Sequence, residues 1–320
     1  MAFLRKRKIA VLGYGSQGRA QALNLRDSGC RVVVGLRPHS PSFQMARRDA
    51  MTAKPIPQAL MGADLICFLF PDEFQREIYL KYVAPQLRKG ISLMFAHGFN
   101  ITFKKICPPE FVNVFMISPK GPGPWLRKAY LENDGVPALL AIHQDVTGQT
   151  QKLALAYAKA IGCVKRGLFE TTFREETLSD LFGEQTVLCG GVIELMKAAF
   201  DTLVRGGISP RAAYFECFHE LKFIVDLLHH QGISGMAESV SSTAHYGGMT
   251  RGSRLVNASI RQELQKILKE IQSGKFAEEW LLENRRGRKR YKSLARQMAR
   301  HPIEHWGRKI RKEIGYSRSS

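Results

Sequence analysis

One segment of the sequence combines three glycines at a spacing that is typical of a dinucleotide phosphate site. It is the GxGxxG motif Gly13-Tyr14-Gly15-Ser16-Gln17-Gly18. The motif follows a β-rich run at residues 7–13 and opens a helix-compatible segment at residues 16–27, which is the context that its chemistry needs. The first glycine permits a tight turn, the second lets the backbone approach a pyrophosphate, and the helix N-terminus supplies free N–H groups. The motif therefore predicts a dinucleotide-binding site.

The residues after the next strand-like run indicate which dinucleotide is bound. Residues 30–35 form that run, and no acidic residue follows it at the position where an NADH-dependent enzyme holds the ribose hydroxyls. Arg37, Ser40 and Ser42 instead supply one cation and two hydroxyl donors, which suit a 2′-phosphate. The sequence thus favours NADPH over NADH, the alternative being a glycine turn followed by an ordinary basic loop.

Two pairs of carboxylates could hold a metal ion. Asp180 and Glu184 are four residues apart, and Glu216 and Glu220 repeat this spacing in a second helical segment. Residues four apart on a helix share one face, and like charges there are unfavourable without a cation. Hard oxygen ligands favour Mg²⁺. Apolar neighbours such as Phe182 predict that these helices are partly buried. Unpaired carboxylates are costly in a buried position. The alternative is that both pairs lie on solvated helix faces.

Two further polar residues follow predicted strands. His97 lies in Ala-His-Gly-Phe-Asn and Lys120 in Pro-Lys-Gly-Pro-Gly. Ligands bind at the carboxyl ends of strands in parallel sheets, so both are candidates for catalysis. A structural histidine and a solvated lysine are the alternatives.

The elements that would position these residues divide the chain into two domains. Apolar runs at residues 64–70, 91–96, 112–117 and 138–142 alternate with helical or turn-rich segments, which indicates a parallel, doubly wound sheet. The segments 178–204, 210–230 and 254–271 have helical periodicity. We therefore expect an α/β Rossmann-type domain at residues 1–171 and an all-α domain with a basic C-terminal tail at residues 172–320.

The chain of 320 residues carries a formal charge of +20. Residues 285–320 hold thirteen Arg and Lys and two acids, and so supply +11 of it. This tail could contact nucleic acid, but a solvated basic face is the favoured interpretation. No apolar run is long enough to span a membrane, no secretion signal is evident, and the six cysteines form no CxxC pair. We expect a soluble, cytoplasmic protein with free thiols.

Taken together, the motifs resemble ketol-acid reductoisomerase in its short form with a single helical domain. The resemblance runs in order through GYGSQGRAQALNLRDSG, VGLRPHSPS, PDEFQ, AHGFNI, PKGPG, ETTFREETLSDLFGEQ, AYFECFHELK and FAEEWLLEN. It implies that NADPH is held by Tyr14 to Gln17, Arg37, Ser40, Ser42, the segment Asp72, Glu73, Phe74 and Gln75, and Gly123. It also implies that His97 is the active-site histidine, that Ser241 binds substrate, and that Asp180, Glu184, Glu216 and Glu220 are the metal ligands.

The resemblance further implies the reaction and the assembly. Two Mg²⁺ ions would bind a small 2-hydroxy-3-keto acid, either 2-acetolactate or 2-aceto-2-hydroxybutyrate, before alkyl migration and reduction by NADPH, steps of valine and isoleucine biosynthesis. Glu220 would transfer a proton, and Lys120 would offset negative charge near the metal. The glutamate-bearing helices would come from a partner subunit, which implies at least a homodimer. Two other interpretations stay open, a metal-independent β-hydroxyacid-type reductase and a former enzyme that binds nucleic acid through its basic tail.

Overall fold

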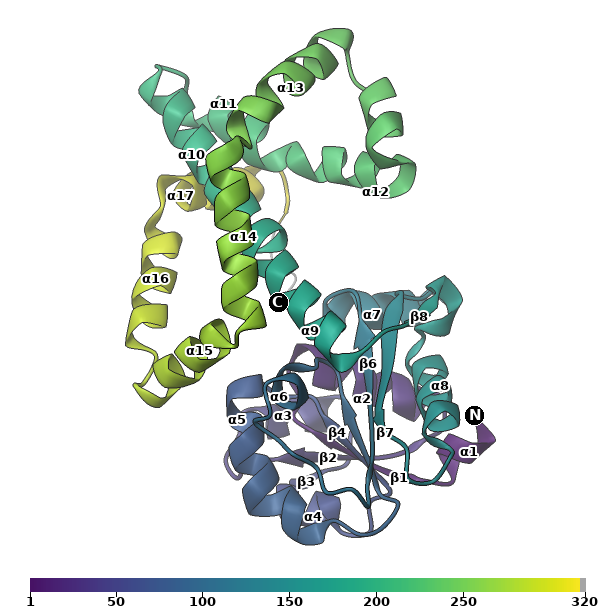
Figure 1. The fold of residues 1–320 in the computed structure, drawn as a ribbon. Helices are drawn as coiled ribbons and strands as arrows, with labels where there is room; N and C mark the ends of the chain where they lie inside the picture. The colour runs from purple at the N-terminus through teal and green to yellow at the C-terminus, as the bar shows by residue number, and fades with distance from the viewer. Residues whose placement is uncertain (317–320) are drawn as a thin grey trace. The chain divides into compact units, whose positions relative to one another are not determined.

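The computed structural model describes residues 1–316 and divides into two compact units, the first at Met1–Ser179 and the second beginning at Asp180. The first unit is an α/β layer structure and the second is helical (Figure 1), as the sequence predicts. Within the described residues, no helix is long and apolar enough to cross a membrane.

The first unit contains an eight-stranded sheet with the order β3-β2-β1-β4-β5-β6-β7-β8. Its strands are β1 (Lys8–Leu12), β2 (Arg31–Leu36), β3 (Ala53–Pro55), β4 (Leu65–Phe68), β5 (Ser92–Phe95), β6 (Asn113–Pro119), β7 (Ala138–Gln144) and β8 (Leu168–Glu170). Neighbouring strands are parallel except β6 and β7, which are antiparallel. The expected parallel, doubly wound sheet is therefore confirmed for β1 to β6, whereas β7 and β8 run in the opposite direction, which an apolar run does not encode.

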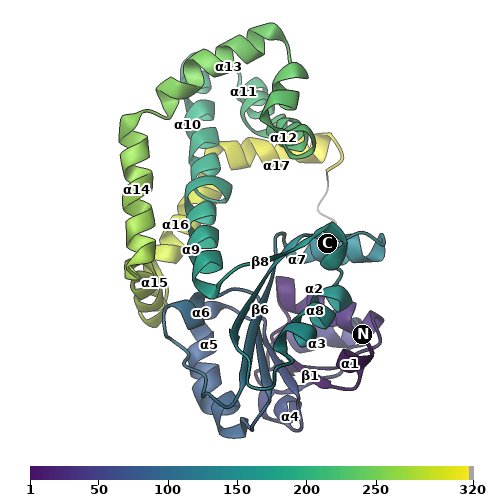
Figure 2. The same cartoon turned by 45° about the vertical axis from the view of Figure 1, so that its right-hand side comes forward.

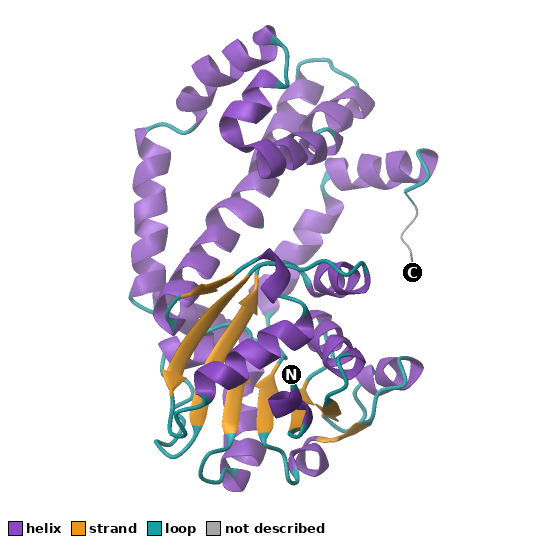
Figure 3. Ribbon diagram, turned by 90° about the vertical axis from the view of Figure 1, so that its right-hand side faces the viewer, coloured by secondary structure: helices purple, strands orange, loops and turns teal. Residues whose placement is uncertain are grey.

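Helices cover both faces of this sheet (Figure 3), and alternate strand residues enter two separate cores. In β1, Ile9 and Val11 join one core, whereas Ala10 and Leu12 join the other, as the two-residue period of a strand requires. The helical elements of this unit are α1 (Ala2–Arg5), α2 (Ser16–Asp27), α3 (Ser42–Arg48), α4 (Ile56–Leu60), α5 (Asp72–Ile78), η1 (Tyr79–Val83), η2 (Ala84–Gln86), α6 (Phe99–Thr102), α7 (Gly123–Leu131), α8 (Thr150–Ile161) and η3 (Val164–Arg166).

Helix α9 (Phe173–Gly183) contains the last residues of the first unit and the first residues of the second. The second unit continues with η4 (Glu184–Leu188), α10 (Gly191–Arg205), α11 (Pro210–Tyr214), η5 (Phe215–His219), α12 (Leu221–Glu238), α13 (Ser242–Leu255), α14 (Ala258–Gln272), α15 (Lys275–Arg285), α16 (Lys289–Arg300) and α17 (Pro302–Glu313), as Figure 2 shows. Its buried core is small and centres on Phe200, Tyr214, Ile303 and Ile310.

Candidate active site

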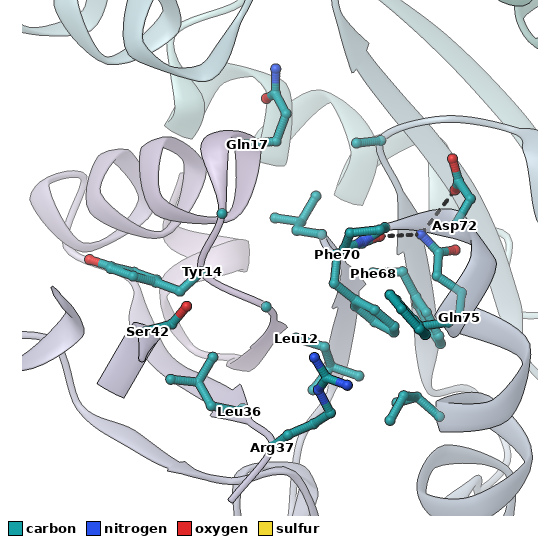
Figure 4. A pocket seen from close by; sticks show the side chains of 18 of the residues that line it. Leu12, Tyr14, Gln17, Leu36, Arg37, Ser42, Phe68, Phe70, Asp72 and Gln75 are labelled. Atoms are coloured by element: carbon teal, nitrogen blue, oxygen red, sulfur yellow. Dashed lines mark hydrogen bonds between the residues drawn. The ribbon is translucent and has the colours of Figure 1, made fainter. Parts of the chain in front are cut away.

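A cavity of about 430 Å³ lies where the strand order reverses between β1 and β4 (Figure 4). Such a switch point is where open α/β sheets bind dinucleotides. Most of the cofactor residues expected from the sequence line the cavity: Gly13, Tyr14, Gly15, Ser16, Gln17, Arg37, Ser40, Ser42, Asp72, Phe74 and Gln75. Gly18, Glu73 and Gly123 do not line it. The sequence did not reveal its apolar walls, which include Leu12, Leu36, Ile56 and Phe68.

The glycines of the motif differ in what surrounds them. Gly13 has a φ of +93°, and a Cβ there would lie 2.6 Å from the Leu69 carbonyl oxygen. A Cβ at Gly18 would lie 2.7 Å from the Gly13 carbonyl oxygen, so this glycine allows α2 to approach the turn. A Cβ at Gly15 would meet nothing within 4 Å. Gly15 therefore leaves open space in front of the α2 N-terminus, and a pyrophosphate fits there.

The end of β2 presents cations and hydroxyls to the cavity. Arg37 lies over the Phe74 ring, with its guanidinium carbon 5.3 Å from the ring centroid. Ser40 and Ser42 line the same cavity. Among its described lining residues the acid is Asp72, whose Oδ1 accepts a hydrogen bond from Gln75 Nε2 at 3.1 Å. No carboxylate thus follows β2 where it would repel a 2′-phosphate.

Tyr14 has a role within the protein that the sequence did not reveal. Its buried hydroxyl donates to Asp49 Oδ2 at 2.9 Å, and Arg19 binds both oxygens of Asp49 at 2.7 and 2.8 Å. The Arg19 guanidinium holds the pKa of Asp49 below its usual value. Asp49 directly follows α3, the helix that begins at Ser42. It therefore joins the far end of α3 to the glycine loop.

The most buried charge in the first unit is Glu176, which was also missed from the sequence. The residue is fully buried, and one of its oxygens accepts from Ser118 Oγ at 2.7 Å and lies 3.3 Å from Lys120 Nζ. The other accepts from the Gly98 N–H at 3.0 Å and lies 3.0 Å from His97 Nδ1. Burial opposes ionisation, but His97, Lys120 and Ser118 together lower the pKa of Glu176 to about 2. Glu176 is therefore an anion at neutral pH.

His97, Glu176 and Asp180 form the group that could hold a metal ion in the described part of the chain. One ligand atom from each lies within 4.8 Å of the other two. Glu176 and Asp180 are one turn apart on α9, so the helix itself sets their spacing. Imidazole and carboxylate ligands are compatible with a divalent cation, and carboxylates suit Mg²⁺.

The other predicted metal ligands do not belong to this group. Glu184 begins the π-helical segment η4, Glu216 lies in a second one, η5, and Glu220 follows it. Such segments are rare and often occur at functional sites. All three glutamates are exposed, so the burial that the sequence predicted for them is not seen in the single chain. The predicted substrate residue, Ser241, is also exposed and caps α13 by accepting from the Ala244 N–H at 3.2 Å.

The nucleotide cavity and the anion beside it define an oxidoreductase that uses a nicotinamide dinucleotide. Comparison with protein families identifies which one. Residues 3–167 match the acetohydroxy acid isomeroreductase NADPH-binding domain, and residues 173–315 match the ketol-acid reductoisomerase C-terminal domain. The chain belongs to the ketol-acid reductoisomerase family, whose members are both oxidoreductases and isomerases.

Solved structures agree with this assignment. An NADH-preferring ketol-acid reductoisomerase from an uncultured archean is 46% identical, with a TM-score of 0.95 over 97% of this chain and 96% of that one. A semialdehyde dehydrogenase NAD-binding protein from Cupriavidus necator is 20% identical, with a TM-score of 0.64 over 83% and 99% of the two chains. A pyrroline-5-carboxylate reductase from Coxiella burnetii is 12% identical, with a TM-score of 0.58 over 83% and 96%. The last two show a shared fold alone.

Proposed function

We propose that this reductoisomerase uses NADPH and two Mg²⁺ ions to convert 2-acetolactate or 2-aceto-2-hydroxybutyrate into the 2,3-dihydroxy acid. One observation carries the proposal. His97 lines the nucleotide cavity and also contacts Glu176, which lies with Asp180 in the group that could hold a metal. Hydride donor and metal-bound substrate would therefore meet at the same place.

The residues of the site fit both NADPH and Mg²⁺. Gly15 leaves room for a pyrophosphate. The Asn100 side-chain amide donates to the Asp72 carbonyl oxygen and to Gln75 Oε1, and both of these residues line the cavity. Its buried Oδ1 has no hydrogen-bond partner among the described residues. Asp180 and Glu176 would hold metal in this chain. Glu184, four residues after Asp180, would be a further ligand, and Glu216 and Glu220 would complete the site from the glutamate-bearing helices of a second subunit. Bound Mg²⁺ would polarise the substrate oxygens.

The chemistry needs three proton transfers and one hydride transfer. The C2 hydroxyl of the substrate loses a proton, the alkyl group moves with its electron pair from C2 to C3, and the C3 oxygen gains a proton. Hydride from NADPH then reduces the new C2 ketone, whose oxygen takes a second proton. Glu220 would move protons on the substrate, Ser241 would bind the substrate, and Lys120 would stabilise the neighbouring negative charge.

One assay tests this function. The oxidation of NADPH is measured with racemic 2-acetolactate as substrate, first in the presence of Mg²⁺ and then after EDTA has removed it. We expect turnover that depends on Mg²⁺ and a loss of at least a hundredfold in Asp180→Asn, since a metal ligand is removed. Turnover that survives EDTA would instead indicate a metal-independent β-hydroxyacid-type reductase. Absence of turnover in the wild-type chain with Mg²⁺ would indicate a former enzyme.

The preference for NADPH is a separate proposal, and it differs from the preference stated for the archean relative. Its support is the cation and two hydroxyls at the end of β2. Hydrogen bonds to a charged group contribute about 1.5–3 kcal/mol each. We therefore expect Ser40→Ala and Ser42→Ala each to lower kcat/KM for NADPH by roughly tenfold or more and to leave NADH unchanged. An equal loss with both cofactors would contradict the proposal.

A homodimer is proposed because the second unit leaves large apolar side chains uncovered. Ile233 is 78% exposed, Leu188 67% and Tyr246 63%. Apolar exposure on this scale usually marks an interface. Light scattering of the purified protein should give at least twice the 36.0 kDa mass of the chain, and Ile233→Asp should weaken assembly. A wild-type monomer at micromolar concentration would exclude the shared site.

A further inference from the structure

Helix α16, in the yellow-green part of the second unit in Figure 1, separates its charged and apolar residues onto opposite faces. Every residue of this helix is exposed. Lys289, Arg296 and Arg300 recur at intervals of seven and four residues and so form one row. Tyr291, Leu294 and Met298 form the opposite stripe and are about half exposed. The cationic face therefore carries no large apolar side chain.

A cavity of about 400 Å³ lies on this cationic face. It is lined by polar residues, namely Ser293, Arg296, Gln297, Arg300 and His301. His301 is fixed at the edge of the cavity, since its Nε2 lies 3.3 Å from Asp201 Oδ2 and its Nδ1 accepts from the Ile303 N–H at 3.3 Å. The lining thus offers hydroxyl, amide and guanidinium donors.

The acids that lie near this helix contact residues other than Lys289, Arg296 and Arg300, and Asp201 faces His301. Glu279 pairs with Arg290, Glu283 accepts from the Tyr291 N–H, and Glu304 pairs with Arg311. In the region that the structure describes, Lys289, Arg296 and Arg300 form no ion pair. Their charges are therefore available to an external anion.

We propose that the cationic face of α16 binds the phosphate backbone of a nucleic-acid strand. Helical rise separates Arg296 from Arg300 by about 6 Å and Lys289 from Arg300 by about 16 Å. A single small anion would contact only the two arginines in the cavity. A nucleic-acid strand, with a charge every ~3.4 Å, can contact Lys289, Arg296 and Arg300 together. Arginine guanidinium groups, serine hydroxyls and glutamine amides all donate hydrogen bonds to phosphate oxygens.

Two other kinds of partner fit this face less well. A protein interface would need apolar residues at its centre, and these lie on the opposite side of α16. A membrane would contact the apolar stripe and leave the cationic cavity facing water. The net charge of +20 would further attract a polyanion.

The proposal is tested with the full-length protein and a fluorescent 20-base-pair DNA, by anisotropy in a series of KCl concentrations. Three phosphate contacts predict a slope of log K against log salt near −2.7, or about a 40-fold loss of affinity between 50 and 200 mM. The double variant Arg296→Gln/Arg300→Gln should lower the slope by about 1.8. The matched control Lys89→Gln/Lys159→Gln removes two exposed charges from the first unit and should leave the slope unchanged. Acetolactate turnover should be normal in both variants.

Several outcomes would overturn the proposal. One is that the wild-type protein does not bind the DNA at 50 mM KCl. Another is that the control variant loses as much DNA affinity as Arg296→Gln/Arg300→Gln, which would show a general charge effect. Displacement of the DNA by 1 mM inorganic phosphate would show a site for a small anion only. Binding to phosphatidylserine vesicles that is lost in Leu294→Ser but kept in Arg296→Gln/Arg300→Gln would show a membrane surface instead.

Discussion

Replacing Glu176 with glutamine tests whether the buried anion organises the site. Glutamine keeps the shape of the side chain and can still accept from Ser118 or the Gly98 N–H. It removes the charge that faces His97 and Lys120. Glu176→Gln should therefore destabilise the metal-free protein, because it removes the buried negative charge that these two groups contact.

The size of this effect follows from the pKa of the carboxyl. Lowering that pKa from 4.5 to about 2 corresponds to about 3 kcal/mol at neutral pH, since the neutral amide resembles the protonated acid. Removing one partner from a buried ion pair costs about 3–5 kcal/mol, which agrees. For a unit of this size, the melting temperature should fall by roughly 6–12 °C.

Thermal unfolding in EDTA, followed by circular dichroism, measures this difference. Because the pKa is lower in the folded state, the stabilisation is complete above about pH 4.5 and is lost as the pH falls toward 2. The gap between wild type and variant should therefore narrow as the pH falls below about 4.5. The control Glu175→Gln, an exposed neighbour, should change stability by less than about 0.5 kcal/mol. A variant as stable as wild type at pH 7 would refute the reasoning.

Three further predictions concern the first unit, and one of them has its control, Gly248→Ala, in the second unit. Asp49→Asn should raise the KM for NADPH with little change in kcat, because it frees α3 from the glycine loop; steady-state kinetics would contradict this if kcat fell instead. Gly98→Ala should lower the melting temperature by several degrees, because its Cβ would lie 2.3 Å from Thr177 Oγ1 and 2.7 Å from a backbone oxygen of α9. Gly248→Ala, in open space, should be neutral or stabilising by up to about 1 kcal/mol. A thiol reagent at pH 7 should modify exposed Cys107 and spare Cys67, whose pKa burial raises; equal rates would contradict the buried position.

Much of the first unit could be predicted from the sequence. The helix expected at residues 16–27 is α2 with the same bounds, and each of the four later apolar runs overlaps a strand. The glycine motif and Arg37, Ser40 and Ser42 meet at one cavity. The helix and the strands could be predicted because they depend on local spacing, and the switch point of the sheet then brings the glycine loop and the residues after β2 to one cavity.

Glu176 could not be found in the same way. In the sequence it stands beside Glu175 in the charged first turn of a helix, which resembles a solvated position. Its burial depends on groups at the ends of β5 and β6, 56 to 79 residues earlier. The one local signal was its spacing of four residues from Asp180. The π-helical segments η4 and η5 also lack a sequence pattern from which they could have been predicted.

The position of Glu176 also determines where the chain can be truncated without disrupting the first unit. A fragment that ends at residue 167, the limit of the matched NADPH-binding domain, would contain His97, Ser118 and Lys120 but not the carboxylate that they share. Such a fragment would keep every strand except β8 but would lose the buried anion that His97 and Lys120 contact. Adding residues 168–179 restores the carboxylate together with the Phe173 and Thr177 packing of α9. The last strand and first turns of α9 thus belong to the folding unit of the nucleotide-binding domain.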